Sequence, residues 1–134
     1  MKPIELHPFT LKEAAKFMKA TKDKSYRLPR NSLFAIAAAQ EIGDKVLLIG
    51  TAIAIRPTKG MDDGETVELK DIHVTKEYPE SCMKLYKSCQ DVAFAMGCNY
   101  LVSYLYDVDT GKTIQEQYSE YKAKAEKEQN GLLN

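Results

Sequence analysis

The clearest pattern in the chain is a run with strand periodicity followed by a run with helical periodicity, at residues 65–98. In the first run apolar residues occupy alternate positions, but the alternation changes face near Lys70 and Asp71. A change of face inside one strand is typical of a β-bulge, which inserts one extra residue. The positions that define the alternation are Val67, Leu69, Ile72 and Val74. The pattern therefore predicts a bulged strand.

The second run predicts a long amphipathic helix that begins near Ser81, after a polar turn at residues 75–79. Gly97 lies at the position where a glycine commonly ends a helix. The first backbone N–H groups of such a helix have no partners within it, so they are available to an anion. The predicted apolar stripe consists of Cys82, Leu85, Cys89, Val92, Ala93 and Met96.

The chain before this region begins with a predicted strand and helix. Ile4 and Leu6 alternate with polar residues, as in a short strand. Thr10 and Glu13 have the spacing of a capping box, which predicts a helix at residues 11–20. Residues 21–32 are rich in polar and basic side chains, which favours an exposed connection over a phosphate-binding segment.

A β-hairpin is predicted next. Residues 33–42 and 46–56 are apolar runs separated by residues 43–45, which begin with a Gly-Asp pair that has hairpin-turn chemistry. The second run is apolar almost without alternation, which predicts a central strand covered on both faces. Gly50 and the small residues that follow it predict that a neighbouring segment approaches this strand closely.

The C-terminal third predicts one more strand and one more helix. Residues 99–106 alternate apolar and aromatic side chains, as in a strand. Two strands joined by the long helix would form a right-handed β-α-β crossover, with the strands parallel and adjacent. Residues 107–111 predict a loop, and residues 112–129 a surface helix that ends at residues 130–131. The predicted order is β-α-β-β-β-α-β-α, in one α/β domain at residues 1–134.

Composition and charge argue against several functions. The 134 residues contain 19 basic and 19 acidic side chains without a long block of like charge, so nucleic-acid binding is not expected. The longest apolar runs are too short to span a bilayer, and Met1 is not followed by a leader pattern, so we expect a cytoplasmic protein without membrane association. The three cysteines and two histidines lack metal-ligand spacing, so we expect free thiols and no metal site.

Three segments of the chain resemble the GNAT superfamily of N-acetyltransferases and, within it, a small phage- and prophage-associated group. They are VLLIGTAIAIRPTKGMDDGETVELKDIHV, SCMKLYKSC and AMGCNYLVSYLYDVDTGKT. The likeness covers residues 11–113. It implies a mixed α/β (α+β) fold, with a mainly antiparallel sheet and one parallel β-α-β crossover. GNAT folds normally add two strands after the last helix, and here a helix at residues 112–129 takes their place.

The resemblance implies acetyl-CoA as the cofactor. In GNAT proteins the backbone of a bulge in the fourth strand receives the pantetheine arm, which corresponds to Asp71, Ile72 and His73. The following turn and helix start hold the pyrophosphate, which corresponds to residues 75–82. The candidate contacts in that segment are Lys76, Ser81 and Cys82.

This pyrophosphate segment departs from the family pattern. It has no glycine, and it carries Glu77 and Glu80 close to a helix N-terminus that would have to receive an anion. Lys76 only partly offsets the two carboxylates. Each of them should cost a bound phosphate about 1 kcal/mol when solvated.

The resemblance also implies two catalytic positions. Acetyl transfer to an amine needs a base to deprotonate the ammonium and an acid to protonate the departing thiolate. Superfamily members often take the base from a carboxylate in the fourth strand and the acid from a tyrosine in the helix after the fifth strand. These locations correspond to Glu68 and Tyr118. A plain strand carboxylate and a packed stripe residue explain the same positions without catalysis.

Two functions follow from the resemblance. The first is an acyltransferase that moves an acetyl group from acetyl-CoA to an unidentified amine. The alternative is a catalytically inactive, phage-encoded protein that acts by binding a partner. Without the two last strands the fifth strand would be an exposed edge, which a homodimer or a partner protein could cover. A V-shaped gap beside this strand favours the first function, and a gap filled by Tyr104 or Tyr106 favours the second.

Overall fold

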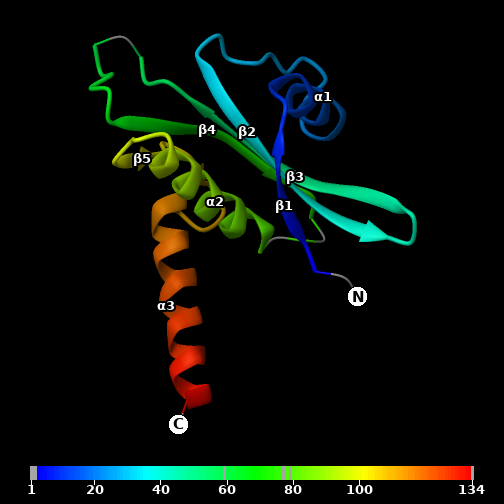
Figure 1. The fold of residues 1–134 in the computed structure, drawn as a ribbon, viewed down its shortest axis with the longest axis vertical. Helices are drawn as coiled ribbons and strands as arrows, with labels where there is room; N and C mark the ends of the chain where they lie inside the picture. Colours follow the sequence, from blue (N-terminus) through cyan, green and yellow to red (C-terminus); the bar gives the residue numbers. More distant parts are fainter. Residues whose placement is uncertain (1–2, 59, 77, 79, 134) are drawn as a thin grey trace.

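The computed structural model describes residues 3–58, 60–76, 78 and 80–133, without the side chains of residues 132 and 133. Its elements follow the predicted order, with one small extra hairpin before the last helix (Figure 1). They are β1 (Glu5–Phe9), α1 (Leu11–Thr21), β2 (Ser32–Ile42), β3 (Lys45–Ile55), β4 (Thr66–Val74), α2 (Ser81–Ala95), β5 (Tyr100–Val102), β6 (Tyr106–Asp107), β7 (Lys112–Thr113) and α3 (Ile114–Leu133).

The core of the fold is a five-stranded sheet in the order β1-β2-β3-β4-β5. Neighbouring strands are antiparallel except β4 and β5, which are parallel and joined by α2 as the crossover. α1 packs Phe17 and Met18 on one face of the sheet, beside Ile53. α2 packs Leu85 on the other face, beside Leu69. The mixed, mainly antiparallel sheet that we predicted is therefore confirmed.

Two of the predicted helix ends that depend on local signals are confirmed. The Thr10 side chain accepts a hydrogen bond from the Glu13 backbone N–H at 3.0 Å, which caps α1. At the end of α2, Gly97 has φ +88°, a backbone conformation that favours glycine. The N–H of Cys98 then donates to the carbonyl of Ala93 at 2.9 Å, and the N–H of Gly97 donates to Phe94 at 3.0 Å. This pair of bonds is a Schellman motif, which satisfies carbonyl groups at the helix end.

The predicted bulge in β4 is also present. Ile53 of β3 lies opposite Asp71 and Ala54 lies opposite Leu69, so Lys70 is the extra residue. Because of this insertion the apolar residues before and after the bulge face the same way. Val67, Leu69, Ile72 and Val74 all pack in the clusters on the α2 side of the sheet.

The prediction of a strand at residues 99–106 was too long. β5 ends at Val102, where the side chain of Ser103 replaces the backbone ladder by donating to the carbonyl of Leu69 at 3.0 Å. The chain then enters the β6-β7 hairpin, whose turn closes with the N–H of Gly111 donating to Asp107 at 2.8 Å. β5 is an edge of the five-stranded sheet, as we predicted. A homodimer or partner chain on this edge stays a prediction.

The last helix is longer than predicted. α3 continues to Leu133 instead of ending at residues 130–131. Gly131 does not adopt a positive φ, and a glycine ends a helix only where the backbone turns into the left-handed region. In Figure 1, α3 (orange to red) begins beside α2 and extends away from the sheet. No helix in the part of the chain described combines the length and apolar character needed to cross a membrane.

The predicted central strand is covered only along part of its length. Val46, at the start of β3, is 64% exposed, and the next two leucines are also exposed. The reason is that the β2-β3 hairpin extends past both of its neighbours (Figure 1). β1 pairs with β2 only at residues 35–39, and β4 pairs with β3 only at residues 50–55.

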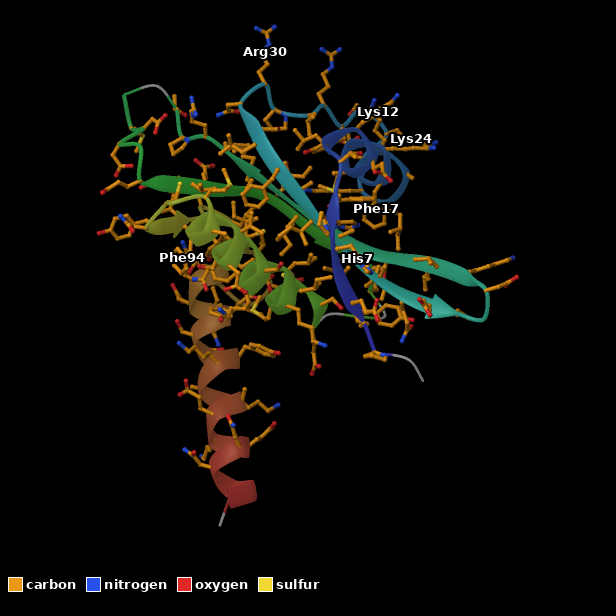
Figure 2. The ribbon with its side chains drawn as sticks, viewed as in Figure 1. His7, Lys12, Phe17, Lys24, Arg30 and Phe94 are labelled. Carbon is orange, nitrogen blue, oxygen red and sulfur yellow. The ribbon has the colours of Figure 1, made fainter. Side chains whose placement is uncertain are left out.

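The connection between α1 and β2 is exposed, as predicted. Lys24 and Arg30 are solvent-accessible residues of this segment. Figure 2 shows both side chains, and that of Lys12 on α1, pointing outward into solvent. Tyr26 and Leu28, by contrast, pack beside α1 and hold the connection to the core.

Candidate functional site

The two parallel strands separate after three residue pairs, and we call this point the fork. β4 and β5 pair only from Thr66 and Tyr100 to Glu68 and Val102. Beyond the fork, residues 70–74 of β4 have no strand partner on the β5 side among the described residues. Backbone groups on an unpaired strand edge can bind an extended ligand in place of a strand. The two strands therefore separate, which is the arrangement that favours the first of the two functions considered above.

Ser103 holds the fork open at its apex. Its hydroxyl donates to the carbonyl of Leu69 at 3.0 Å and accepts from the N–H of Leu105 at 3.2 Å. Gln115 of α3 donates from Nε2 to the carbonyl of Ser103 at 3.0 Å. These bonds direct the chain away from β4 immediately after β5. The sequence reasoning missed Ser103, and a single polar residue with apolar and aromatic neighbours was the only available signal.

On the α2 side of the sheet the gap opens into two adjoining hollows, which we call the α2-side groove. The first, of about 270 Å³, is lined by Ile72, Cys82, Leu105, Tyr106, Asp107, Ile114 and Gln117. The second, of about 410 Å³, is lined by Glu80, Cys82, Met83, Thr110, Lys112, Gln117, Glu120, Tyr121 and Lys124. Tyr104 and Tyr106 are 71% and 60% exposed, so neither tyrosine fills the gap.

The outer hollow of this groove has balanced charge. Lys112 and Lys124 supply two positive charges, and Glu80 and Glu120 supply two negative charges. Lys112 forms an ion pair with Glu120, with Nζ and Oε1 2.6 Å apart. An anion bound here would therefore compete with a carboxylate for Lys112. The groove can attract phosphate only weakly by charge alone.

The predicted pyrophosphate contacts lie at the start of α2 and in the turn before it. Lys76 is exposed, and Cys82 lines both hollows. Ser81 is 1% exposed, and its Oγ has no hydrogen-bond partner among the described residues. A buried hydroxyl without a partner is costly, so a hydrogen bond from a water molecule or a ligand at this helix start would stabilise it. Glu77 lies outside the described residues.

The thiols at this site are not nucleophiles at neutral pH. Burial raises the pKa of Cys82 to about 11, because the thiolate loses solvation. Burial also raises the pKa of Cys89, deeper in the core, to about 12. The described structure leaves the cysteines free, in agreement with the sequence prediction.

We expect Cys82 to be alkylated by iodoacetamide about 100-fold more slowly in the folded protein than in urea, because only the thiolate reacts. Peptide mass spectrometry after timed quenching measures the rate at each cysteine separately. The rate at Cys82 should keep rising with pH toward about 11. A rate that levels off near the ordinary thiol pKa of 9.0 would instead indicate simple shielding and contradict the raised pKa.

Glu68 lies on the opposite face of the sheet from the α2-side groove. Its neighbours Val67 and Leu69 are buried on the α2 side, so the side chain between them projects the other way. There it lines an open hollow of about 580 Å³, which we call the Glu68 hollow. The hollow is lined by Pro57, Thr58, Met61, Thr66, Glu68, Lys70, Val102 and Tyr104. The fork thus has an open hollow on each face.

Tyr118 lines neither the α2-side groove nor the Glu68 hollow. Its ring packs on Tyr86 of α2, with the ring centroids 4.8 Å apart, and on Tyr121 at 6.4 Å. Among the described residues, the α3 side chains that line the inner hollow are those of Ile114 and Gln117. The structure therefore brings Glu68 to the fork and does not bring Tyr118 to the same hollow. The role of Tyr118 as an acid stays a prediction.

The three bulge residues divide between the two faces. Ile72 lines the inner hollow of the α2-side groove. Asp71 points toward the α1-β2 connection, where it accepts a hydrogen bond from the Tyr26 hydroxyl at 2.8 Å and lies 3.7 Å from Lys22 Nζ. His73 lies against Phe17, with the ring centroids 6.3 Å apart. The side chain of Asp71 therefore holds the connection in place and that of His73 packs on α1, so each residue offers only its backbone to a ligand at the gap.

Burial is the main cause of the pKa shifts in the cluster formed by Lys22, Tyr26, Asp71 and His73. The pKa of His73 is lowered, first by burial and then by the nearby charge of Lys22. The pKa of Tyr26 is raised, first by burial and then by its hydrogen bond to Asp71. At neutral pH the cluster therefore contains a neutral imidazole and a protonated phenol, together with the Lys22–Asp71 ion pair.

Comparisons with known proteins identify the fold. No family model matches the sequence, and no curated protein matches it. Among solved structures, a putative acetyl transferase from Pyrococcus furiosus superposes with a TM-score of 0.63 and 13% identity, over 89% of this chain and 91% of that chain. An aminoglycoside N-acetyltransferase in complex with CoA superposes with a TM-score of 0.62 and 17% identity, over 90% of this chain and 87% of that chain.

A third structure agrees with these two. A ribosomal-protein-alanine N-acetyltransferase from Brucella melitensis gives a TM-score of 0.58 and 17% identity, over 86% of this chain and 90% of that chain. These identities are low, so the likeness establishes the fold alone. The chain has the fold of GNAT acetyltransferases, as the resemblance implied. The phage-associated group stays a prediction.

Proposed function

We propose that this protein is an acyltransferase that moves an acetyl group from acetyl-CoA to an amine. The observation that carries the proposal is the fork, which has an unpaired β4 edge, a groove on one face and a hollow containing Glu68 on the other face. A donor on one face and an acceptor on the other would meet at the fork. The GNAT-like fold supports this assignment.

The residues around the groove fit the pantetheine arm of acetyl-CoA. The unpaired edge at residues 70–74 offers backbone groups to the amides of the arm, as a neighbouring strand would. Ile72, Leu105 and Ile114 supply apolar walls for its hydrocarbon parts. Lys112 and Lys124 would hold phosphate oxygens in the outer hollow. When bound, acetyl-CoA supplies the acyl group in activated form, as a thioester.

Glu68 would handle the proton of the acceptor. A carboxylate beside the fork can take a proton from an ammonium, either directly or through one water molecule. Glu68 is half-buried, and its carboxylate forms no ion pair with another described residue. Tyr118 is our proposal for the group that delivers a proton from Oη to the thiolate leaving group, on the basis of the GNAT resemblance.

Calorimetric titration with acetyl-CoA and CoA tests the proposal, together with thiol release in the presence of a panel of amines. We expect saturable binding of both cofactors and thiol release with at least one amine. A calorimetric blank at millimolar acetyl-CoA would contradict the proposal. Binding without turnover of any amine would favour the alternative of a non-catalytic binding protein.

The carboxylate beside the proposed phosphate position gives a second prediction. Glu80 occupies the N-cap position of α2 without a side-chain cap bond and lines the outer hollow. A carboxylate at this place opposes a bound phosphate, so Glu80→Gln should raise the affinity for CoA about two- to five-fold. Calorimetry measures the change. Glu128→Gln, on the exposed half of α3, is the matched control and should leave the affinity unchanged. Weaker binding by Glu80→Gln would contradict this placement of the phosphates.

A further inference from the structure

The Glu68 hollow contains one negative and one positive side chain that do not pair with each other. Glu68 and Lys70 both line it, because side chains two residues apart in a strand project from the same face. Neither charge forms an ion pair within the described residues. A ligand that carries both charges could therefore satisfy the two side chains at once.

The remaining walls of the hollow are largely apolar. Pro57 and Met61 come from the β3-β4 connection, and Val102 and Tyr104 come from β5 and the residues after it. Met61 and Tyr104 are both exposed large side chains. Apolar surface beside two charged groups suits a ligand with a charged end and an apolar body.

We infer that the Glu68 hollow binds a free α-amino acid with an apolar side chain, its ammonium at Glu68 and its carboxylate at Lys70. The inference rests on the proposed function for the fate of the amine, but binding to the hollow does not require the cofactor. The apolar side chain would lie against Met61 and Tyr104. The ammonium would then lie on the Glu68 side, close to the fork.

The charge balance argues against two other acceptors. An amino sugar with several ammonium groups would meet one carboxylate and one repelling lysine. The nearby Asp62 adds little, because Arg56 Nε lies 3.6 Å from its carboxylate. The N-terminal ammonium of a peptide would pair with Glu68, but the uncharged amide that follows it could not form an ion pair with Lys70.

The chemical balance of the transfer is complete. An N–C bond forms between the amino acid and the acetyl carbon, and the C–S bond of acetyl-CoA breaks. The ammonium loses two protons. One passes to Glu68 and then to solvent, and the other ends on the thiol of free CoA. The product is an N-acetylated amino acid, whose carboxylate still faces Lys70 but whose nitrogen no longer carries a charge for Glu68.

The test uses the whole protein without cofactor and three probes followed by NMR. L-leucine carries both charges, L-leucinamide mimics a peptide N-terminus, and neamine is an amino sugar without a carboxylate. We expect L-leucine to bind most tightly and to shift the backbone amide signals of Glu68 and Lys70. Lys70→Gln should lower the affinity for L-leucine about ten-fold and leave the affinity for L-leucinamide unchanged, since the substitution removes one charge-assisted contact. Lys84→Gln, on the exposed side of α2, is the control and should change neither of these two affinities.

Several outcomes would overturn the inference. These are tighter binding of L-leucinamide or neamine than of L-leucine, no binding of L-leucine at millimolar concentration, or an unchanged L-leucine affinity in Lys70→Gln. Circular dichroism of each variant verifies that it is folded. Binding of L-leucine by a protein that does not bind acetyl-CoA would support the amino-acid site and contradict the acyltransferase. Binding of acetyl-CoA without L-leucine would do the reverse.

Discussion

Replacing Glu68 by glutamine should lower kcat for acetyl transfer about 10²- to 10⁴-fold, the range typical of a lost general base. The amide keeps the shape of the side chain but cannot accept a proton from the acceptor ammonium. The measurement is thiol release at saturating acetyl-CoA, with the amine that the wild-type protein acetylates fastest. Cofactor affinity should be nearly unchanged, because Glu68 lies on the face opposite the α2-side groove.

Two further variants make this result specific. Glu128→Gln removes an exposed carboxylate from α3 and should keep wild-type activity. Tyr118→Phe tests the predicted acid, and a lower kcat with unchanged cofactor affinity would support it. If Glu68→Gln retains more than half of the wild-type kcat, Glu68 is not the base. The proton would then pass directly to water or to another group at the fork.

Replacing Gly50 by alanine should lower the free energy of unfolding by about 1–3 kcal/mol, because it overpacks a buried site. A β-carbon at Gly50 would lie 2.7 Å from the carbonyl oxygen of His73 and 2.9 Å from Cγ2 of Val74. The first of these atoms is backbone in β4, so it cannot move away without disturbing the pairing of Gly50 with Val74. Urea denaturation followed by circular dichroism measures the change. The result would also confirm the close approach that the small residues of β3 predicted.

Gly131→Ala is the matched control. A β-carbon at Gly131 would meet no atom within 4 Å, and this glycine has no positive φ. Alanine also has the higher helix propensity, so we expect unchanged or slightly greater stability. Equal stabilities of Gly50→Ala and wild type would show that β3 and β4 can separate at this position without cost.

The site was only partly accessible to sequence reasoning. The bulge at Lys70 was predicted because strand alternation is a local pattern and a shift in it reveals an inserted residue, whereas Glu68 was a candidate only through the GNAT resemblance. The hollow that combines Glu68 with Met61 and Tyr104 was not predicted. Its walls come from three segments separated along the chain, and no periodicity relates them. The packing of Tyr118 on Tyr86 was not predicted either, because it depends on which face of α3 contacts α2.

The sequence by itself determined the features that depend on neighbours along the chain. These include the cap at Thr10, the Schellman motif at Gly97, the element order and the bulge in β4. Each rests on a few backbone groups and a short-range periodicity, so adjacent residues are sufficient to specify it. The overall α/β architecture followed from their order.

Only the tertiary structure decided where the elements stop and separate. β5 ends after Val102 because Ser103 bonds to Leu69 on another strand, and the start of β3 is exposed because its neighbours pair with other residues. Both outcomes depend on contacts between segments far apart in sequence, which no local pattern contains. The fork arises in this way, and the proposed function of the bulged strand rests on it.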